Sequence, residues 1–133
     1  MSSREQFVRR MFQEAWSQGH TAMIAEEIGD VIFHYGGDHR RTTGQELRSV
    51  VERWRQGFPD LRFHVEDLVE DDDRIAVRAR LRGTHLGRWR DLPATTREID
   101  IEVMMFFRWE NGRLVEIWEV DDAQTRDRQL GIV

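Results

Sequence analysis

The feature that most constrains the fold lies in the last third of the chain, where two strand-like segments flank an Asn-Gly pair. Residues 99–109 and 114–120 are rich in β-branched and aromatic side chains, and Asn-Gly occupies positions 111–112 between them. Asn-Gly is the most typical sequence for a two-residue hairpin turn. Two adjacent carboxylates, Asp121 and Asp122, follow the second strand. We therefore predict a long antiparallel hairpin that ends in an acidic pair.

Three helices are expected before the strands, and a short one after them. Apolar residues at spacings of three and four predict helices over residues 4–17 and about 20–28. Thr43 and Glu46 have the spacing of a capping box, which opens a third helix that runs to about residue 56. Residues 123–130 form a short amphipathic tail that stops at a glycine.

Alternating apolar and polar side chains predict further strands, over residues 31–35, 61–69 and 74–85. Residues 86–96 are expected to form an irregular connection. Helices followed by a run of antiparallel strands indicate an α+β fold, in which helices close the concave face of a curved sheet. With 133 residues and no linker, the chain is expected to form one domain, residues 1–133.

Composition excludes several kinds of function. The net charge is −5 and no basic stripe stands out, so nucleic acid is not an expected partner. All 20 basic residues are arginine and cysteine is absent, which rules out lysine and thiol nucleophiles. His, Asp and Glu never cluster at metal-ligand spacing, so no metal site is expected. No leader-like or membrane-spanning apolar run is found, which favours a cytoplasmic protein without membrane contact.

Four segments together resemble one known family, the SnoaL-like polyketide cyclases of the nuclear-transport-factor-2-like superfamily. They are residues 58–63, 83–87, 111–118 and 122–131, and they occur in the family's order. The resemblance implies a cone or half-barrel of curved mixed sheet, commonly dimeric, with a pocket between sheet and helices. It also implies ring closure by intramolecular aldol condensation without metal or cofactor.

The resemblance places the family's catalytic aspartate nine residues before Gly131, at Asp122. The alternative is that Asp122 caps the terminal helix, and Asp121 could then exchange roles with it, since neighbours on an extended chain point to opposite faces. Trp118 is in phase with Asp122, so we expect it either to form a pocket wall or to be core.

Two histidines and three further side chains complete the predicted site. His85 and His34 are candidates to polarise a substrate carbonyl, the alternatives being a half-exposed strand-end histidine and a hydrogen-bonded core histidine. Trp54, Met105 and Phe107 are expected to line the pocket. Three alternating arginines, Arg78, Arg80 and Arg82, are expected on a solvated outer face or a subunit contact, with one beside a substrate oxygen as an alternative.

The leading hypothesis is a cofactor-free cyclase of aromatic polyketides, acting as a homodimer on a hydrophobic aromatic small molecule. In it, burial raises the pKa of Asp122, which removes a proton from carbon and returns it to the new alkoxide. One alternative is a partner in polyketide hydroxylation or oxygenation, favoured by the lack of histidine in residues 99–109, where cyclases carry one near Met105. Another is a non-catalytic domain that binds hydrophobic small molecules.

Overall fold

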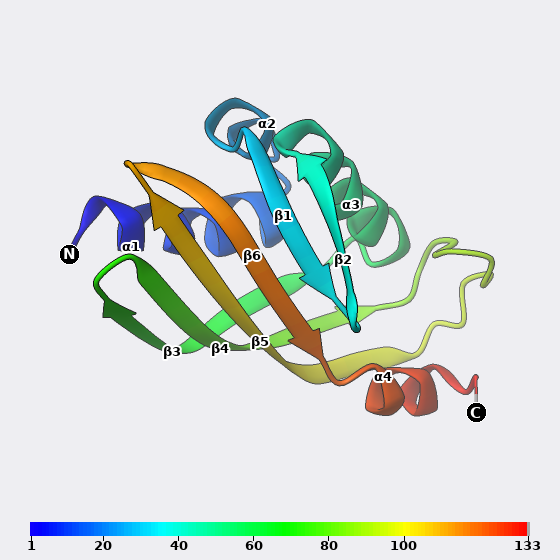
Figure 1. The fold of residues 1–133 in the computed structure, drawn as a ribbon. Helices are drawn as coiled ribbons and strands as arrows, with labels where there is room; N and C mark the ends of the chain where they lie inside the picture. The colour runs from blue at the N-terminus through cyan, green and yellow to red at the C-terminus, as the bar shows by residue number, and fades with distance from the viewer. Residues whose placement is uncertain (133) are drawn as a thin grey trace.

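A strongly curved six-stranded sheet in the order β2-β1-β6-β5-β4-β3 forms the body of the protein (Figure 1). The structure is a computed structural model that describes residues 1–132. Only the β1–β6 pair is parallel, so the sheet is mixed. The strands are β1 (Asp30–Tyr35), β2 (Asp38–Thr43), β3 (Arg62–Asp71), β4 (Arg74–Thr84), β5 (Glu98–Glu110) and β6 (Arg113–Asp121).

The N-terminal helices cover one face of this sheet, and the last helix lies beside β5 (Figure 1). The helical segments are α1 (Ser3–Arg10), its π-helical continuation η1 (Met11–Trp16), α2 (Ala22–Glu27), α3 (Gly44–Gly57) and α4 (Ala123–Leu130). The Thr43 hydroxyl accepts a hydrogen bond from the Glu46 backbone N–H at 3.2 Å, as the capping box predicts. The predicted α+β class, with a curved mixed sheet closed by three N-terminal helical segments, is confirmed.

Three hairpins turn through residues with positive φ, and the β3–β4 turn has one such residue, Asp72, with φ of 52°. Gly36 and Gly37 have φ of 60° and 90° between β1 and β2, and Asn111 and Gly112 have φ of 51° and 77° between β5 and β6. Positive φ at both central positions is what the type I′ turn of a two-residue hairpin requires. The predicted Asn-Gly hairpin is therefore confirmed.

One strand was missing from the sequence prediction. Residues 38–43 form β2, although their sequence Asp-His-Arg-Arg-Thr-Thr carries no apolar alternation. β2 is an edge strand, and most of its side chains are exposed, so its sequence lacks the pattern that burial imposes. Periodicity alone cannot detect such a strand.

A β-bulge in β6 decides which side chains face the helices. Trp109 pairs with Leu114 and Arg108 pairs with Glu116, so Val115 is an extra residue in β6. An extra residue reverses the alternation of every side chain that follows it. Beyond Val115, the inward row of β6 is therefore Ile117, Glu119 and Asp121, and the outward row is Glu116, Trp118 and Val120.

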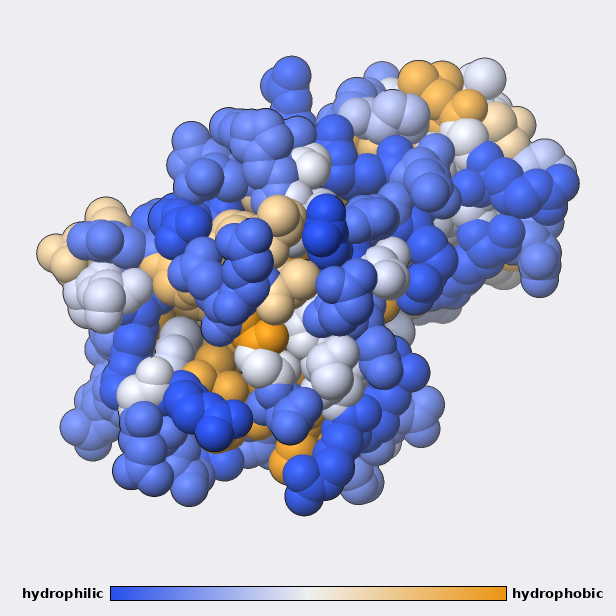
Figure 2. All heavy atoms as spheres, turned by 90° about the horizontal axis from the view of Figure 1, so that it is seen from above, coloured by the Kyte–Doolittle hydropathy of each residue, from blue (hydrophilic) through white to orange (hydrophobic). Residues whose placement is uncertain are grey.

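The core lies between the helices and the inward face of the sheet, where the inward side chains of β4 and β5 are buried almost completely. Seen from above the view of Figure 1, the surface is mostly hydrophilic, with apolar side chains showing in its middle (Figure 2). Within residues 1–132, no helix combines the length and the apolar character that crossing a membrane would need.

Candidate active site

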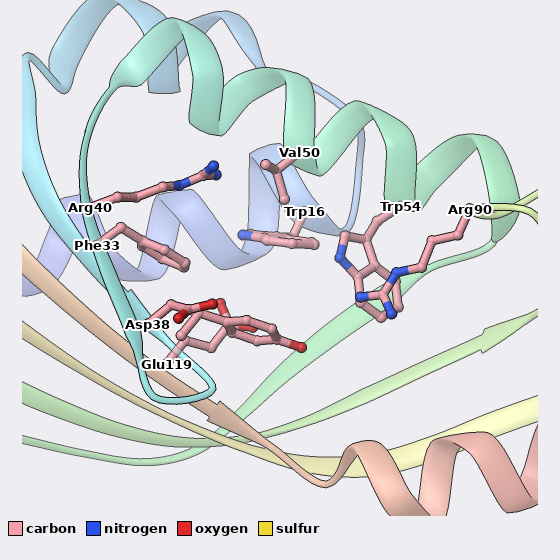
Figure 3. A pocket seen from close by; sticks show the side chains of 9 residues that line it. Trp16, Phe33, Asp38, Arg40, Val50, Trp54, Arg90 and Glu119 are labelled. Atoms are coloured by element: carbon pink, nitrogen blue, oxygen red, sulfur yellow. The ribbon is translucent and has the colours of Figure 1, made fainter.

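A cavity of about 260 Å³ opens between the helical layer and the β1–β6 half of the sheet (Figure 3). Its lining comes from η1, α3, the β1–β2 hairpin, β6 and the connection between β4 and β5, and it consists of Trp16, Phe33, Tyr35, Asp38, Arg40, Val50, Trp54, Arg90 and Glu119. A mostly apolar cavity with a few polar groups is the usual form of a small-molecule site.

Aromatic rings form two sides of the cavity. Trp16 and Trp54 meet edge to face, with ring centroids 6.5 Å apart, on the helical side. Phe33 and Tyr35 lie two residues apart on β1, so both point inward, and their rings are nearly parallel at 6.3 Å. These faces can hold a flat, hydrophobic ring system.

Glu119 is one of two carboxyl groups that line this cavity, the other being that of Asp38. It points inward from β6, directly across from Met105 on β5, and it makes no hydrogen bond or ion pair with residues 1–132. Burial raises the pKa of Glu119 to about 8; the charge of Asp121 adds to the rise and Arg126 opposes it. Glu119 can therefore both accept and donate a proton near neutral pH.

Three polar side chains adjoin Glu119 and hold one another in place. The Tyr35 hydroxyl donates a hydrogen bond to Asp121 Oδ2 at 2.9 Å, and Arg126 Nη1 lies 3.7 Å from the same oxygen. The Asp121 side chain is only 5% exposed. Burial, and then the charge of Asp121, raises the pKa of Tyr35. Asp121 is therefore fixed beside the cavity, with a negative charge that acts on Glu119.

Arg126 brings a buried positive charge to this network from α4. It is 3% exposed, and its guanidinium lies 4.9 Å from the Trp89 ring and 6.0 Å from the Trp54 ring. Its Nε donates to Asp127 at 3.2 Å, and its Nη1 has no hydrogen-bond partner among residues 1–132. The faces of the Trp89 and Trp54 rings stabilise the Arg126 cation by cation–π interaction, where hydrogen bonds to it are few.

The prediction that Asp122 faces an apolar pocket is wrong. Asp122 is exposed at the N-terminus of α4, where its Oδ1 accepts a hydrogen bond from the Thr125 backbone N–H at 3.1 Å. Hydrogen bonds from Thr125 lower the pKa of Asp122, opposite to the expected direction. The alternative that Asp122 caps the helix while Asp121 turns inward agrees with the structure. The bulge at Val115 is the reason, because it shifts the phase of β6 by one residue.

Trp118 and His34 also lie on the opposite face of the sheet from the cavity, against prediction. Their rings stack face to face, 4.7 Å apart and 4° from parallel. His34 Nε2 lies 2.7 Å from Glu116 Oε2, and Arg108 Nε donates to the other oxygen at 3.0 Å. Burial raises the pKa of Glu116, but these bonds outweigh it and leave the pKa below its usual value.

The other predicted residues divide between the core and the cavity. His85 is fully buried: its Nδ1 lies 2.9 Å from the Thr95 hydroxyl, its ring stacks on Phe58, and it does not line the cavity. Phe107 is likewise fully buried, with its ring 6.3 Å from that of Phe12 on η1, and it does not line the cavity. Met105 lines a smaller void of about 40 Å³ that Glu119 shares. Trp54 lines the main cavity, as predicted.

The outer face of the sheet carries the arginines expected there. Arg78 pairs with Glu66 at 3.0 Å, and Arg80 and Arg82 both pair with Asp100, at 2.8 and 3.3 Å. These ion pairs agree with the predicted solvated outer face. The three arginines therefore lie on the opposite side of the sheet from the cavity.

Sequence reasoning missed Glu119, Arg126, Arg40 and Arg90. Glu119 was missed because the bulge in β6 was not recognised. Arg126 was missed because a terminal helix rich in charged residues was expected to be exposed. Arg40 lies on the unpredicted strand, and Arg90 lies in an irregular connection. Within residues 1–132, no three His, Asp or Glu side chains come together as metal ligands would.

The family model for the SnoaL-like polyketide cyclases matches residues 6–130. The chain belongs to the SnoaL-like polyketide cyclase family. It is 29% identical over 135 aligned positions to the aklanonic acid methyl ester cyclases of Streptomyces peucetius and of Streptomyces sp. strain C5. The alignments cover 98% of this chain in both cases, and 92% and 83% of the respective relatives.

Solved structures agree with the fold. AclR from Streptomyces galilaeus superposes with a TM-score of 0.85 at 22% identity, covering 100% of this chain and 98% of AclR. IdmH from Streptomyces antibioticus superposes with a TM-score of 0.82 at 25% identity, covering 98% of this chain and 99% of IdmH.

Proposed function

We propose that this protein closes a ring of an aromatic polyketide by intramolecular aldol condensation, with Glu119 as the group that moves the proton. The observation that carries the proposal is a carboxyl group with a pKa raised to about 8, lining a cavity walled by aromatic rings. Membership in the SnoaL-like polyketide cyclase family, and relatives named as aklanonic acid methyl ester cyclases, support the reaction class.

The chemistry needs one group that takes a proton and later returns it. Glu119 in its ionised form removes a proton from a carbon flanked by carbonyl groups, and the electrons pass into an enolate. The enolate carbon forms a bond to the acceptor carbonyl carbon, whose oxygen becomes an alkoxide. Protonated Glu119 then gives the proton to that alkoxide, so no proton is gained or lost and no oxidant or cofactor enters.

Asp121 and Tyr35 act on this step indirectly. The charge of Asp121 helps to raise the pKa of Glu119, and the hydrogen bond from Tyr35 fixes Asp121 in place. The aromatic walls contribute by holding the flexible substrate folded, which brings the reacting carbons together.

The direct test compares three neighbouring carboxylates in turnover of aklanonic acid methyl ester, the substrate for which the relatives are named. Glu119→Gln keeps the size of the side chain but removes the base, so kcat should fall by about two orders of magnitude or more. Asp122→Asn should stay close to wild type, because Asn also caps helices. Circular dichroism and thermal melts establish that each variant is folded.

The outcomes separate the hypotheses. Full activity in Glu119→Gln with loss in Asp121→Asn would make Asp121 the base. Full activity in both would refute acid–base catalysis from β6. Oxygen consumption coupled to product formation would then favour the hydroxylation hypothesis, and binding without turnover would favour the binding-domain hypothesis.

We also propose that two copies associate through the outer face of the sheet. Large apolar side chains are exposed there next to Trp118: Val69 at 64%, Met104 at 50%, Phe106 at 41% and Val120 at 69%. Contiguous exposed apolar surface of this kind is typical of protein interfaces. Light scattering at micromolar concentration should give a dimer mass, and Val120→Asp should convert it to a monomer. A monomeric wild-type mass would contradict the proposal.

A further inference from the structure

Two arginines flank the cavity from opposite sides. Arg40 comes from β2 on the side of Phe33, and Arg90 comes from the β4–β5 connection beside Trp54 (Figure 3). Neither guanidinium makes an ion pair or hydrogen bond with a carboxylate of residues 1–132, although Asp38 also lines the cavity. Most arginines of the outer face, by contrast, are paired. The cavity is therefore bordered by unpaired positive charge.

The backbone at Arg90 is held in an unfavourable conformation. Trp89 and Leu92 form a tight two-residue turn, with reciprocal backbone hydrogen bonds of 3.1 and 3.0 Å. Arg90 is the first central residue of this turn and has φ of 54°, a region that favours glycine. An arginine therefore occupies a position at the edge of the cavity where glycine would be less strained.

The orientation of the Arg90 side chain is fixed by stacking. Its guanidinium lies 4.2 Å from the centroid of the Trp89 ring. A guanidinium stacked on an aromatic face keeps its in-plane N–H groups free for hydrogen bonds. These donors can bind a planar anion such as a carboxylate in a bidentate manner.

Arg40 is directed to the same cavity by strand register. It pairs with Phe33 across β1 and β2, so the two side chains share the face that borders the cavity. Its neighbours His39 and Arg41 fall on the other face by alternation. The sheet therefore selects one arginine of the Arg40-Arg41 pair for the cavity.

We propose that Arg40 and Arg90, on opposite sides of the cavity, each offer a contact for an anionic group of the ligand, so that an aromatic polyketide with a free carboxylate binds more tightly than the same compound as its neutral ester. This inference rests on the proposed function, since it takes the cavity to be the site of the aromatic substrate. Asp38 and Glu119 are the acidic side chains that line the cavity, and Glu119 opposes a bound anion only in its ionised form.

The test measures binding rather than turnover, with anthraquinone carboxylate and its methyl ester as matched probes. Quenching of tryptophan fluorescence reports on both, because Trp16 and Trp54 line the cavity. Wild type should bind the acid roughly tenfold more tightly than the ester, as expected for a charge-assisted, bidentate contact. This preference should shrink as salt is raised.

Matched variants assign the effect to the two arginines. Arg40→Gln and Arg90→Gln should each weaken acid binding about three- to tenfold and leave ester binding unchanged. Arg88→Gln serves as the control, because Arg88 lies in the same connection but bonds the Asp91 carbonyl and does not line the cavity. Asp38→Asn should change acid binding in the opposite direction, making it tighter.

The outcomes distinguish this inference from the proposed function. Equal affinity of wild type for acid and ester, or equal weakening of both by the arginine variants, would overturn the anion site and leave an aromatic cavity intact. Failure of both probes to bind would overturn the aromatic cavity itself, and with it both proposals.

Discussion

Replacing Glu119 by glutamine should change how the stability of the protein depends on pH. Glu119 has a folded pKa of about 8 against an ordinary value of 4.5, so the folded state holds its proton more tightly than the unfolded chain does. The stabilisation from this proton is complete below about pH 4.5. It is lost as the pH rises towards 8.

The size of the effect follows from the same two values. A rise in pKa from 4.5 to about 8 corresponds to at most about 5 kcal/mol of unfolding free energy. Glu119 lines an open cavity, where water screens the charge, so we expect about 2–3 kcal/mol to be lost between pH 5 and pH 9. Glutamine cannot ionise, and Glu119→Gln should lose none of this.

Urea denaturation at several pH values between 5 and 9 measures the difference directly. Glu119→Gln and wild type should have similar stability near pH 5, and the variant should be the more stable of the two at pH 9. Asp100→Asn is a control from the outward face of the neighbouring strand β5. Despite burial, the pKa of Asp100 lies below its usual value beside Arg80 and Arg82, so its contribution is lost only on acidification and stays constant in this range.

Parallel stability curves for Glu119→Gln and wild type would refute the reasoning. They would mean that Glu119 ionises in the folded protein as it does in water. Its role as a proton carrier at neutral pH would then lose its physical basis, whatever the substrate is.

Two substitutions test the local structure around the site. Asp122→Ala should lower the unfolding free energy by about 1 kcal/mol, because the backbone N–H of Thr125 loses its hydrogen-bond acceptor at the start of α4. Asp122→Asn should not lower it, because asparagine also caps helices. Equal urea midpoints for the two variants would count against the capping role. Gly44→Ala should cost about 3 kcal/mol, because the added Cβ would overlap the backbone carbonyl oxygens of Ile28 and Ile24. A thermal melt unchanged by this substitution would contradict the packing of α2 against α3.

The elements that could be predicted from the sequence are those with strong local signals. Residues 4–17 carry a helical stripe, Thr43 begins α3, and the Asn-Gly turn joins β5 to β6; each depends on chemistry within a few residues. The fold class follows from the order of these elements. β2 could not be predicted in this way, because the side chains of an exposed edge strand need not alternate between apolar and polar.

The site was harder to predict because it depends on one backbone irregularity. Strict alternation from Leu114 places Trp118 and Asp122 inward, whereas the extra residue Val115 places Glu119 and Asp121 inward. Val115 has no sequence signature, since bulges tolerate many residues and a valine is typical of a regular strand. The nine-residue spacing to Gly131 identified the right strand end but not the side chain that faces the cavity.

The buried cation of Arg126 links the terminal helix to the chemistry of the cavity. α4 brings Arg126 close to Asp121, and its positive charge lowers the pKa of Glu119 against the effects of burial and of Asp121. α4 contributes no residue to the lining of the cavity among residues 1–132, yet a substitution that removes this charge would raise the proton affinity of Glu119.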